Sequence, residues 1–97
     1  MKSANPSVRL LSEGEKFIAK EMSANRGELL PKHLASVESV LLIQEGSCVL
    51  HFQDGQQHLQ AGDVFIVPAM LIHQIEARTD FRAVHIMPQE IQFEFFK

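Results

Sequence analysis

The stretch from Gly62 to His73 constrains the fold of this chain more than any other segment. It contains a glycine turn, the apolar run 64–67, Pro68 and then His73. Four apolar residues between a turn and a proline predict a buried strand, because they are too few for a helix. Proline lacks a backbone N–H, so Pro68 should end the pairing of that strand. The stretch therefore predicts a β-sheet protein in which His73 lies just after a fixed bend.

The rest of the chain has the same character. Short apolar or β-branched segments alternate with turn signals at intervals of about eight to twelve residues, which is typical of an all-β barrel or sandwich. Asp54-Gly55 predicts a hairpin with a type I′ turn, because both residues accept positive φ. The segments that we expect to form strands are 8–11, 16–24, 33–35, 38–44, 48–53, 56–60, 64–67, 72–77, 81–87 and 91–96.

Length, charge and cysteine content limit the possible classes of protein. A chain of 97 residues is expected to form one domain with one modest core. Its net charge of −3 and its scattered lysines and arginines argue against a nucleic-acid partner. Its apolar runs are too short to cross a bilayer, so no membrane partner is expected. The single cysteine, Cys48, cannot form an internal disulfide and suits a cytoplasmic location; its apolar neighbours predict a core side chain rather than a reactive thiol.

The two ends of the chain differ in character. The polar residues 1–6 are expected to be loosely held. The tail 91–96 alternates apolar and polar residues and contains three phenylalanines, which is too apolar to extend into water. We expect the tail to pack on its own barrel or on a second subunit. A homodimer is the more economical of these two arrangements.

Six residues at characteristic spacings resemble the two motifs of the cupin family: Gly27, His33 and Gly46 for the first motif, and Gly62, Pro68 and His73 for the second. Met70 stands where the second motif usually has a glycine. The resemblance covers about 27–87 and is to small, single-domain, cupin-2-like proteins. It implies an all-β, cupin-type jelly-roll barrel that occupies 1–97, with a C-terminal strand at about 90–96.

The resemblance also implies a metal site. In metal-bearing cupins, two histidines and a glutamate of the first motif and one histidine of the second bind a first-row transition metal. His33 and His73 match two of these ligands, whereas Ala35 stands at the second histidine position and cannot ligate. Glu38 is a third candidate, but strand alternation turns it away from the face of His33 unless a β-bulge intervenes. The implied cofactor is one divalent metal (Zn, Mn, Fe or Ni) with an incomplete ligand set, or none.

Three further side chains are candidates for a ligand site. His85 lies among apolar residues of the segment 81–87 and could face the cavity in place of a missing ligand. His51 has the same ambiguity, and Ser39 shares the face of His33 by strand alternation. The predicted ligand-binding residues are therefore His33, Ser39, His51, His73 and His85. For each histidine the alternative is a hydrogen-bonded strand residue with no ligand.

Three functions remain open from the sequence. The first is the binding of a small organic molecule in the barrel, with a degenerate metal site. The second is a metal-dependent enzyme of the oxygenase, isomerase or decarboxylase type. The third is a purely interacting subunit whose phenylalanine-rich tail forms its contact surface. The missing metal ligands favour the first function over the second.

Overall fold

The computed structural model describes residues 2–3 and 7–97; the rest of the segment predicted to be loosely held lies outside the described residues. All regular structure in this part of the chain is β-strand, so the predicted all-β fold is confirmed. The seven-stranded sheet contains β1 (Lys2–Ser3), β4 (Glu28–Leu29), β5 (Lys32–Ala35), β7 (Ser47–Phe52), β8 (Gly55–Gln60), β10 (His73–Ala77) and β12 (Phe93–Phe96). The five-stranded sheet contains β2 (Ser7–Glu13), β3 (Phe17–Ala24), β6 (Ser39–Glu45), β9 (Val64–Val67) and β11 (Phe81–Pro88).

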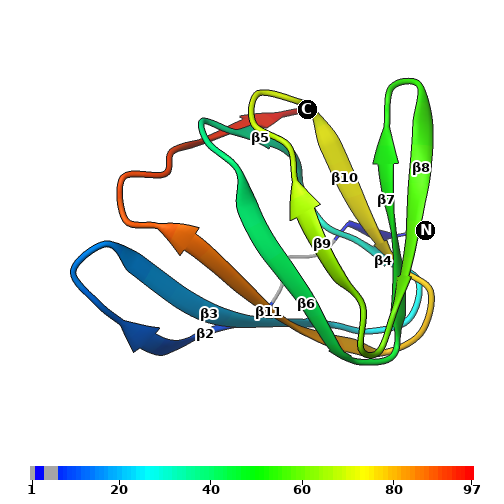
Figure 1. Cartoon of the computed structure of the whole chain (residues 1–97). Coiled ribbons are helices and arrows are strands. Elements are labelled where there is room, and N and C mark those ends of the chain that lie inside the picture. Colours follow the sequence, from blue (N-terminus) through cyan, green and yellow to red (C-terminus); the bar gives the residue numbers. More distant parts are fainter. Residues whose placement is uncertain (1, 4–6) are drawn as a thin grey trace.

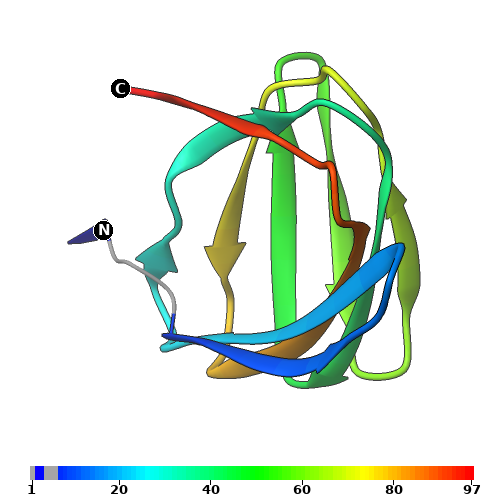
Figure 2. The same cartoon turned by 90° about the vertical axis from the view of Figure 1, so that its left-hand side faces the viewer.

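The two sheets face each other and enclose the interior of the barrel (Figures 1 and 2). In the five-stranded sheet, β11 lies between β3 and β6. In the other sheet, β10 pairs with β4, β5 and β7. Inward side chains from both sheets form one hydrophobic core, which includes Ile43, Leu50 and Phe81. Cys48 belongs to this core and is 1% exposed, so its predicted burial is confirmed.

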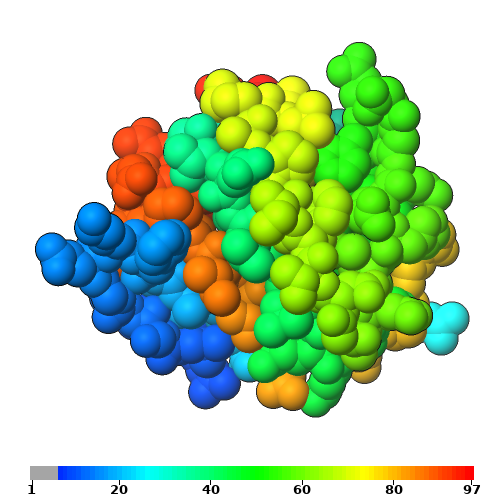
Figure 3. Space-filling model, viewed as in Figure 1, coloured from blue at the N-terminus to red at the C-terminus, as the bar shows by residue number. Residues whose placement is uncertain are grey.

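Strand β9 has the predicted bounds, but it is not buried. Val64 is 61% exposed and Ile66 is 49% exposed, whereas Val67 belongs to the core. The reason is that successive side chains of β9 point to opposite faces of the five-stranded sheet, so Val64 and Ile66 lie on its outer face. A run of four apolar residues hides this alternation in the sequence. Figure 3 shows the outer face, on which β9, β6 and β11 lie side by side.

The hairpin between β7 and β8 is present, but its turn lies one residue earlier than predicted. Gly55 pairs with Phe52, so Gln53 and Asp54 are the two loop residues. Positive φ among the described residues is confined to three glycines and Met70, and Gly55 is not one of these glycines. The type I′ turn is therefore wrong, because Gly55 joins the ladder instead of the loop.

Met70 adopts the backbone conformation that its position in the second motif suggests. Its φ is 59°, in the left-handed region that glycine enters most easily. Its N–H donates a hydrogen bond of 2.7 Å to the carbonyl of Ala35. This bond fixes the bend after β9 against β5 and sets the direction in which the chain enters β10.

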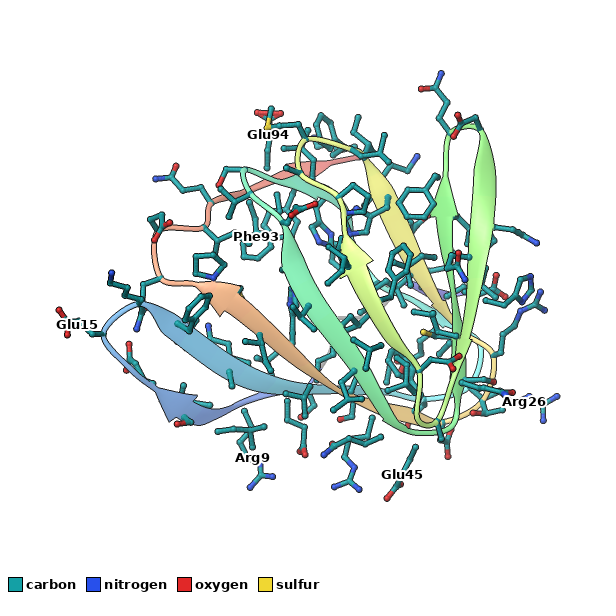
Figure 4. The ribbon with its side chains drawn as sticks, in the orientation of Figure 1. Arg9, Glu15, Arg26, Glu45, Phe93 and Glu94 are labelled. Atoms are coloured by element: carbon teal, nitrogen blue, oxygen red, sulfur yellow. The ribbon has the colours of Figure 1, made fainter. Side chains whose placement is uncertain are left out.

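The phenylalanine-rich tail packs on its own barrel. Strand β12 pairs antiparallel with β5, and Phe95 lies opposite His33. Phe93 points into the barrel and Glu94 points away from it, as Figure 4 shows. The homodimer stays a prediction. Within the described ranges, no helix has the length and apolar character needed to span a membrane.

Candidate functional site

A cavity of about 430 Å³ lies between the two sheets. Most of its wall is apolar, with side chains such as Met22, Leu41, Ile75 and Met87. Two lining residues on opposite sides, Val8 on β2 and Phe95 on β12, are 53% and 63% exposed. The cavity is therefore lined by solvent-exposed side chains from both sheets. The two strands that carry them, β2 and β12, lie on the side that faces the viewer in Figure 2.

The seven-stranded sheet contributes two neighbouring imidazoles to the wall. His33 on β5 and His73 on β10 are paired residues of adjacent strands, and their ring centroids are 4.5 Å apart. The Nδ1 atom of each ring lies 2.9 Å from a backbone carbonyl, that of Pro31 for His33 and that of Leu71 for His73. A carbonyl can only accept, so each Nδ1 carries the proton and donates. When such a ring is neutral, its Nε2 is left as an acceptor for a ligand.

The protonation of His73 follows from its position. Burial in the wall lowers its pKa; the hydrogen bond to the Leu71 carbonyl partly opposes this, and the nearby charge of His33 lowers the pKa further. His73 is only 3% exposed. The ring is consequently neutral at pH 7, which is the state in which Nε2 accepts a hydrogen bond.

The five-stranded sheet contributes a second polar group to the opposite wall. Nε2 of His85 on β11 lies 2.7 Å from the hydroxyl oxygen of Ser39 on β6. Lys20 on β3 is the cross-strand neighbour of His85 and also lines the cavity. Burial lowers the pKa of His85 to about 4, with the charges of His33, His73 and Lys20 acting in the same direction.

Four of the predicted ligand residues line the cavity: His33, Ser39, His73 and His85. His51 lies apart from them. Leu50 belongs to the core and Phe52 packs against it, so both occupy the inner face of β7. Alternation therefore turns His51 to the outer face, where its Nε2 lies 2.7 Å from Oε1 of Glu76. Glu38 is exposed in the bend before β6 and is not part of the cavity wall.

Lys20 is the cavity residue that sequence reasoning missed. In the sequence of 16–24, Phe17 and Ala19 alternate with Lys16 and Lys20, a pattern that predicts Phe17 on the buried face and Lys20 on the exposed face. In the structure, Phe17 is instead 59% exposed. The inward face of β3 instead contains Met22 and Ala24, which contact the core. Lys20 lies two residues before Met22, so its side chain points to the same face. A count from the buried end of the strand would have placed Lys20 on the cavity wall.

The metal site implied by the cupin resemblance does not fit the residues present. Within the described part of the chain, no group of three or more histidine, cysteine, aspartate or glutamate side chains is placed to hold a metal ion. His33 and His73 supply two imidazoles, and the neighbouring wall position is Ala35. Two protein ligands hold a divalent metal weakly compared with the three of a typical catalytic site. The arrangement is thus better suited to hydrogen bonding than to metal chemistry.

Comparison with protein families agrees with this geometry. A family model described as AraC-like ligand binding domain matches residues 24–94, which include β5, β10 and β11 with their cavity side chains. The chain belongs to this family. The matched range contains His33, His73 and His85. No curated protein gives a significant match to the chain.

Solved structures share the fold at low sequence identity. A cupin-2 domain protein from Shewanella frigidimarina is 22% identical, with a TM-score of 0.79 over 89% of this chain and 83% of that one. A cupin superfamily protein from Desulfitobacterium hafniense is 24% identical, with a TM-score of 0.78 over 89% and 79%. A salicylate 1,2-dioxygenase from Pseudoaminobacter salicylatoxidans is 12% identical, with a TM-score of 0.82 over 94% of this chain but only 29% of the dioxygenase. These likenesses confirm the predicted cupin-like jelly roll.

The lowered pKa of His85 predicts that the protein loses stability in mild acid. The ring titrates near pH 6.5 in the unfolded chain and near pH 4 in the folded chain, so between these values the unfolded chain binds the extra proton. Stability present above pH 6.5 is therefore lost as the pH falls towards about 4, by at most about 1.4 kcal/mol per pH unit. Urea unfolding of the wild type and of His85→Gln over this range measures the effect. The variant should show the shallower pH dependence, and equal slopes would contradict the assignment.

Proposed function

We propose that this chain binds a small organic molecule in the cavity between its two sheets. The observation that carries the proposal is the composition of the wall: extensive apolar surface with a few polar groups converging from both sheets. That combination is typical of small-molecule sites, and about 430 Å³ is within their usual size range. Membership of a ligand-binding family supports the same function.

The anchored imidazoles define what such a molecule should carry. The carbonyls of Pro31 and Leu71 fix the rings of His33 and His73, so little side-chain entropy remains to be lost on binding. Their Nε2 atoms accept hydrogen bonds from hydroxyl or N–H groups of the ligand. Phe93 and Phe95, with ring centroids 5.6 and 5.5 Å from that of His33, offer an aromatic surface beside these acceptors. The site therefore suits a compact apolar molecule with at least one donor.

A fragment screen by two-dimensional NMR tests this proposal directly. In the wild-type protein, we expect hits to shift the amide resonances of β5, β10 and β11 around the cavity. Ala35→Leu adds three carbons to a wall residue that is 2% exposed, so the side chain must occupy the cavity. We expect this variant to weaken the hits about tenfold or more while remaining folded.

The matched control makes the same substitution outside the cavity. Ala61 is exposed in the turn before β9, and Ala61→Leu should bind the hits as the wild type does. Hits that bind Ala35→Leu with unchanged affinity would lie outside the cavity and would contradict the proposal. A screen in which no compound shifts the resonances of the cavity wall would contradict it as well.

A further inference from the structure

The two sheets place chemically different polar groups on opposite walls of the cavity. The seven-stranded sheet presents the acceptor atoms Nε2 of His33 and His73. The five-stranded sheet presents the Lys20 ammonium group and the hydrogen-bonded pair Ser39–His85. No aspartate or glutamate is among the described residues that line the cavity. The formal charge of the wall is therefore positive, although the whole chain has a net charge of −3.

Lys20 is not neutralised by the protein itself. The neighbouring carboxylate, that of Glu21, points to the outer face of β3, where it lies 3.1 Å from Arg9 and 3.5 Å from Arg82. Among the described residues, no carboxylate forms an ion pair with Lys20. Lys20 is also half-buried in a mostly apolar wall. A partly desolvated ammonium without a counter-ion is the group that an anionic ligand neutralises most favourably.

His85 connects this cation with the imidazole pair. It is the cross-strand neighbour of Lys20, and its ring centroid lies 6.4 Å from that of Phe93, which lies 5.6 Å from that of His33. The cavity therefore runs from a cationic end on one sheet to an acceptor end on the other. Apolar side chains, including Leu41 and Ile75, lie along the wall.

We propose that the cavity selects small carboxylic acids that also carry a hydroxyl or N–H donor. The carboxylate would pair with Lys20, the donor would meet Nε2 of His33 or His73, and the hydrocarbon between them would contact the apolar wall. The inference rests on the proposed function and deepens it, because it names the class of ligand. A neutral molecule of the same shape leaves the Lys20 ammonium without a counter-ion and binds more weakly.

The test compares para-hydroxyphenylacetate with its neutral amide, para-hydroxyphenylacetamide, by calorimetry and NMR titration. We expect the wild-type protein to bind the acid about tenfold or more tightly than the amide. Lys20→Met retains an apolar side chain of similar length to the lysine stem but removes the charge, so acid and amide should bind this variant equally. Lys20→Arg retains the charge and should retain the preference. Phenylacetate, which lacks the hydroxyl donor, should bind the wild type more weakly than the hydroxylated acid.

The control variant removes a lysine elsewhere on the barrel. Lys32 is exposed on β5 and points away from the cavity, so Lys32→Met should retain the wild-type preference for the acid. Equal binding of acid and amide by the wild type would overturn the carboxylate proposal while leaving the proposed cavity function standing. An acid preference that survives in Lys20→Met would also overturn it. If neither compound binds in the cavity, the result counts against both proposals.

Discussion

Replacing Gly46 with alanine is expected to destabilise the protein by about 2–5 kcal/mol, which is a large part of the stability of a typical domain. A Cβ atom at this position would lie 2.1 Å from the carbonyl oxygen of Asp80 and 2.6 Å from Oγ1 of Thr79. Neither neighbour can move freely, because Oγ1 of Thr79 accepts from the Ser47 N–H at 3.0 Å and donates to the Asp80 carbonyl at 2.8 Å. The φ of Gly46, +76°, adds left-handed strain to the clash.

Two other glycines separate the clash from the strain. Gly27 has a φ of +87° but open space around it, and Gly55 has open space without a left-handed φ. We expect the cost of substitution by alanine to increase from Gly55 through Gly27 to Gly46, as measured by urea unfolding. The Gly46 variant should also unfold at the lowest temperature. If Gly46→Ala costs no more than Gly27→Ala, the packing of the β6–β7 turn against the β10–β11 turn does not determine stability.

The boundaries of the strands follow from short-range features of the sequence. Turn glycines, prolines and β-branched runs define the boundaries of most strands to within a residue or two. The facing of the strands is harder to predict, because an all-apolar run such as 64–67 has no alternation to reveal its outer side. In β3, the exposed Phe17 and the cavity residue Lys20 reverse the expected assignment of faces. Only the pairing with β11 decides which side of β3 is buried.

The candidate site shows the same division between local and tertiary information. The motif spacing indicated that His33 and His73 belong together, and the ladder between β5 and β10 makes them direct partners. His51 has equally apolar neighbours, but it alternates with the inward-facing residues of β7, so its side chain lies on the outer face beside Glu76. Lys20 carries no motif, so its position on the wall depends on how the two sheets are packed. Sequence patterns therefore identify side chains that share one face of a sheet more readily than side chains that meet across a cavity from different sheets.

Ala35→His is expected to convert the cavity into a metal site. Ala35 lies on the same face of β5 as His33 and lines the cavity beside the His33–His73 pair. A third imidazole would complete the ligand number that typical zinc centres with an open position possess. We expect the affinity for Zn²⁺ to increase about 100-fold or more over the wild type. Competition with a zinc-sensitive dye measures this affinity, and Co²⁺ absorption reports a tetrahedral site.

Two controls distinguish a designed centre from adventitious binding. Ala61→His adds an imidazole in an exposed turn and should leave the affinity unchanged. Combining Ala35→His with His73→Leu should remove the gain, because the ion would again have only two ligands. If the wild type already binds Zn²⁺ as tightly as Ala35→His, two imidazoles suffice and the argument from ligand number fails. A gain in Ala35→His that depends on His73 would instead show that the wild-type barrel retains the scaffold of a metal site while its residues favour hydrogen bonding to an organic ligand.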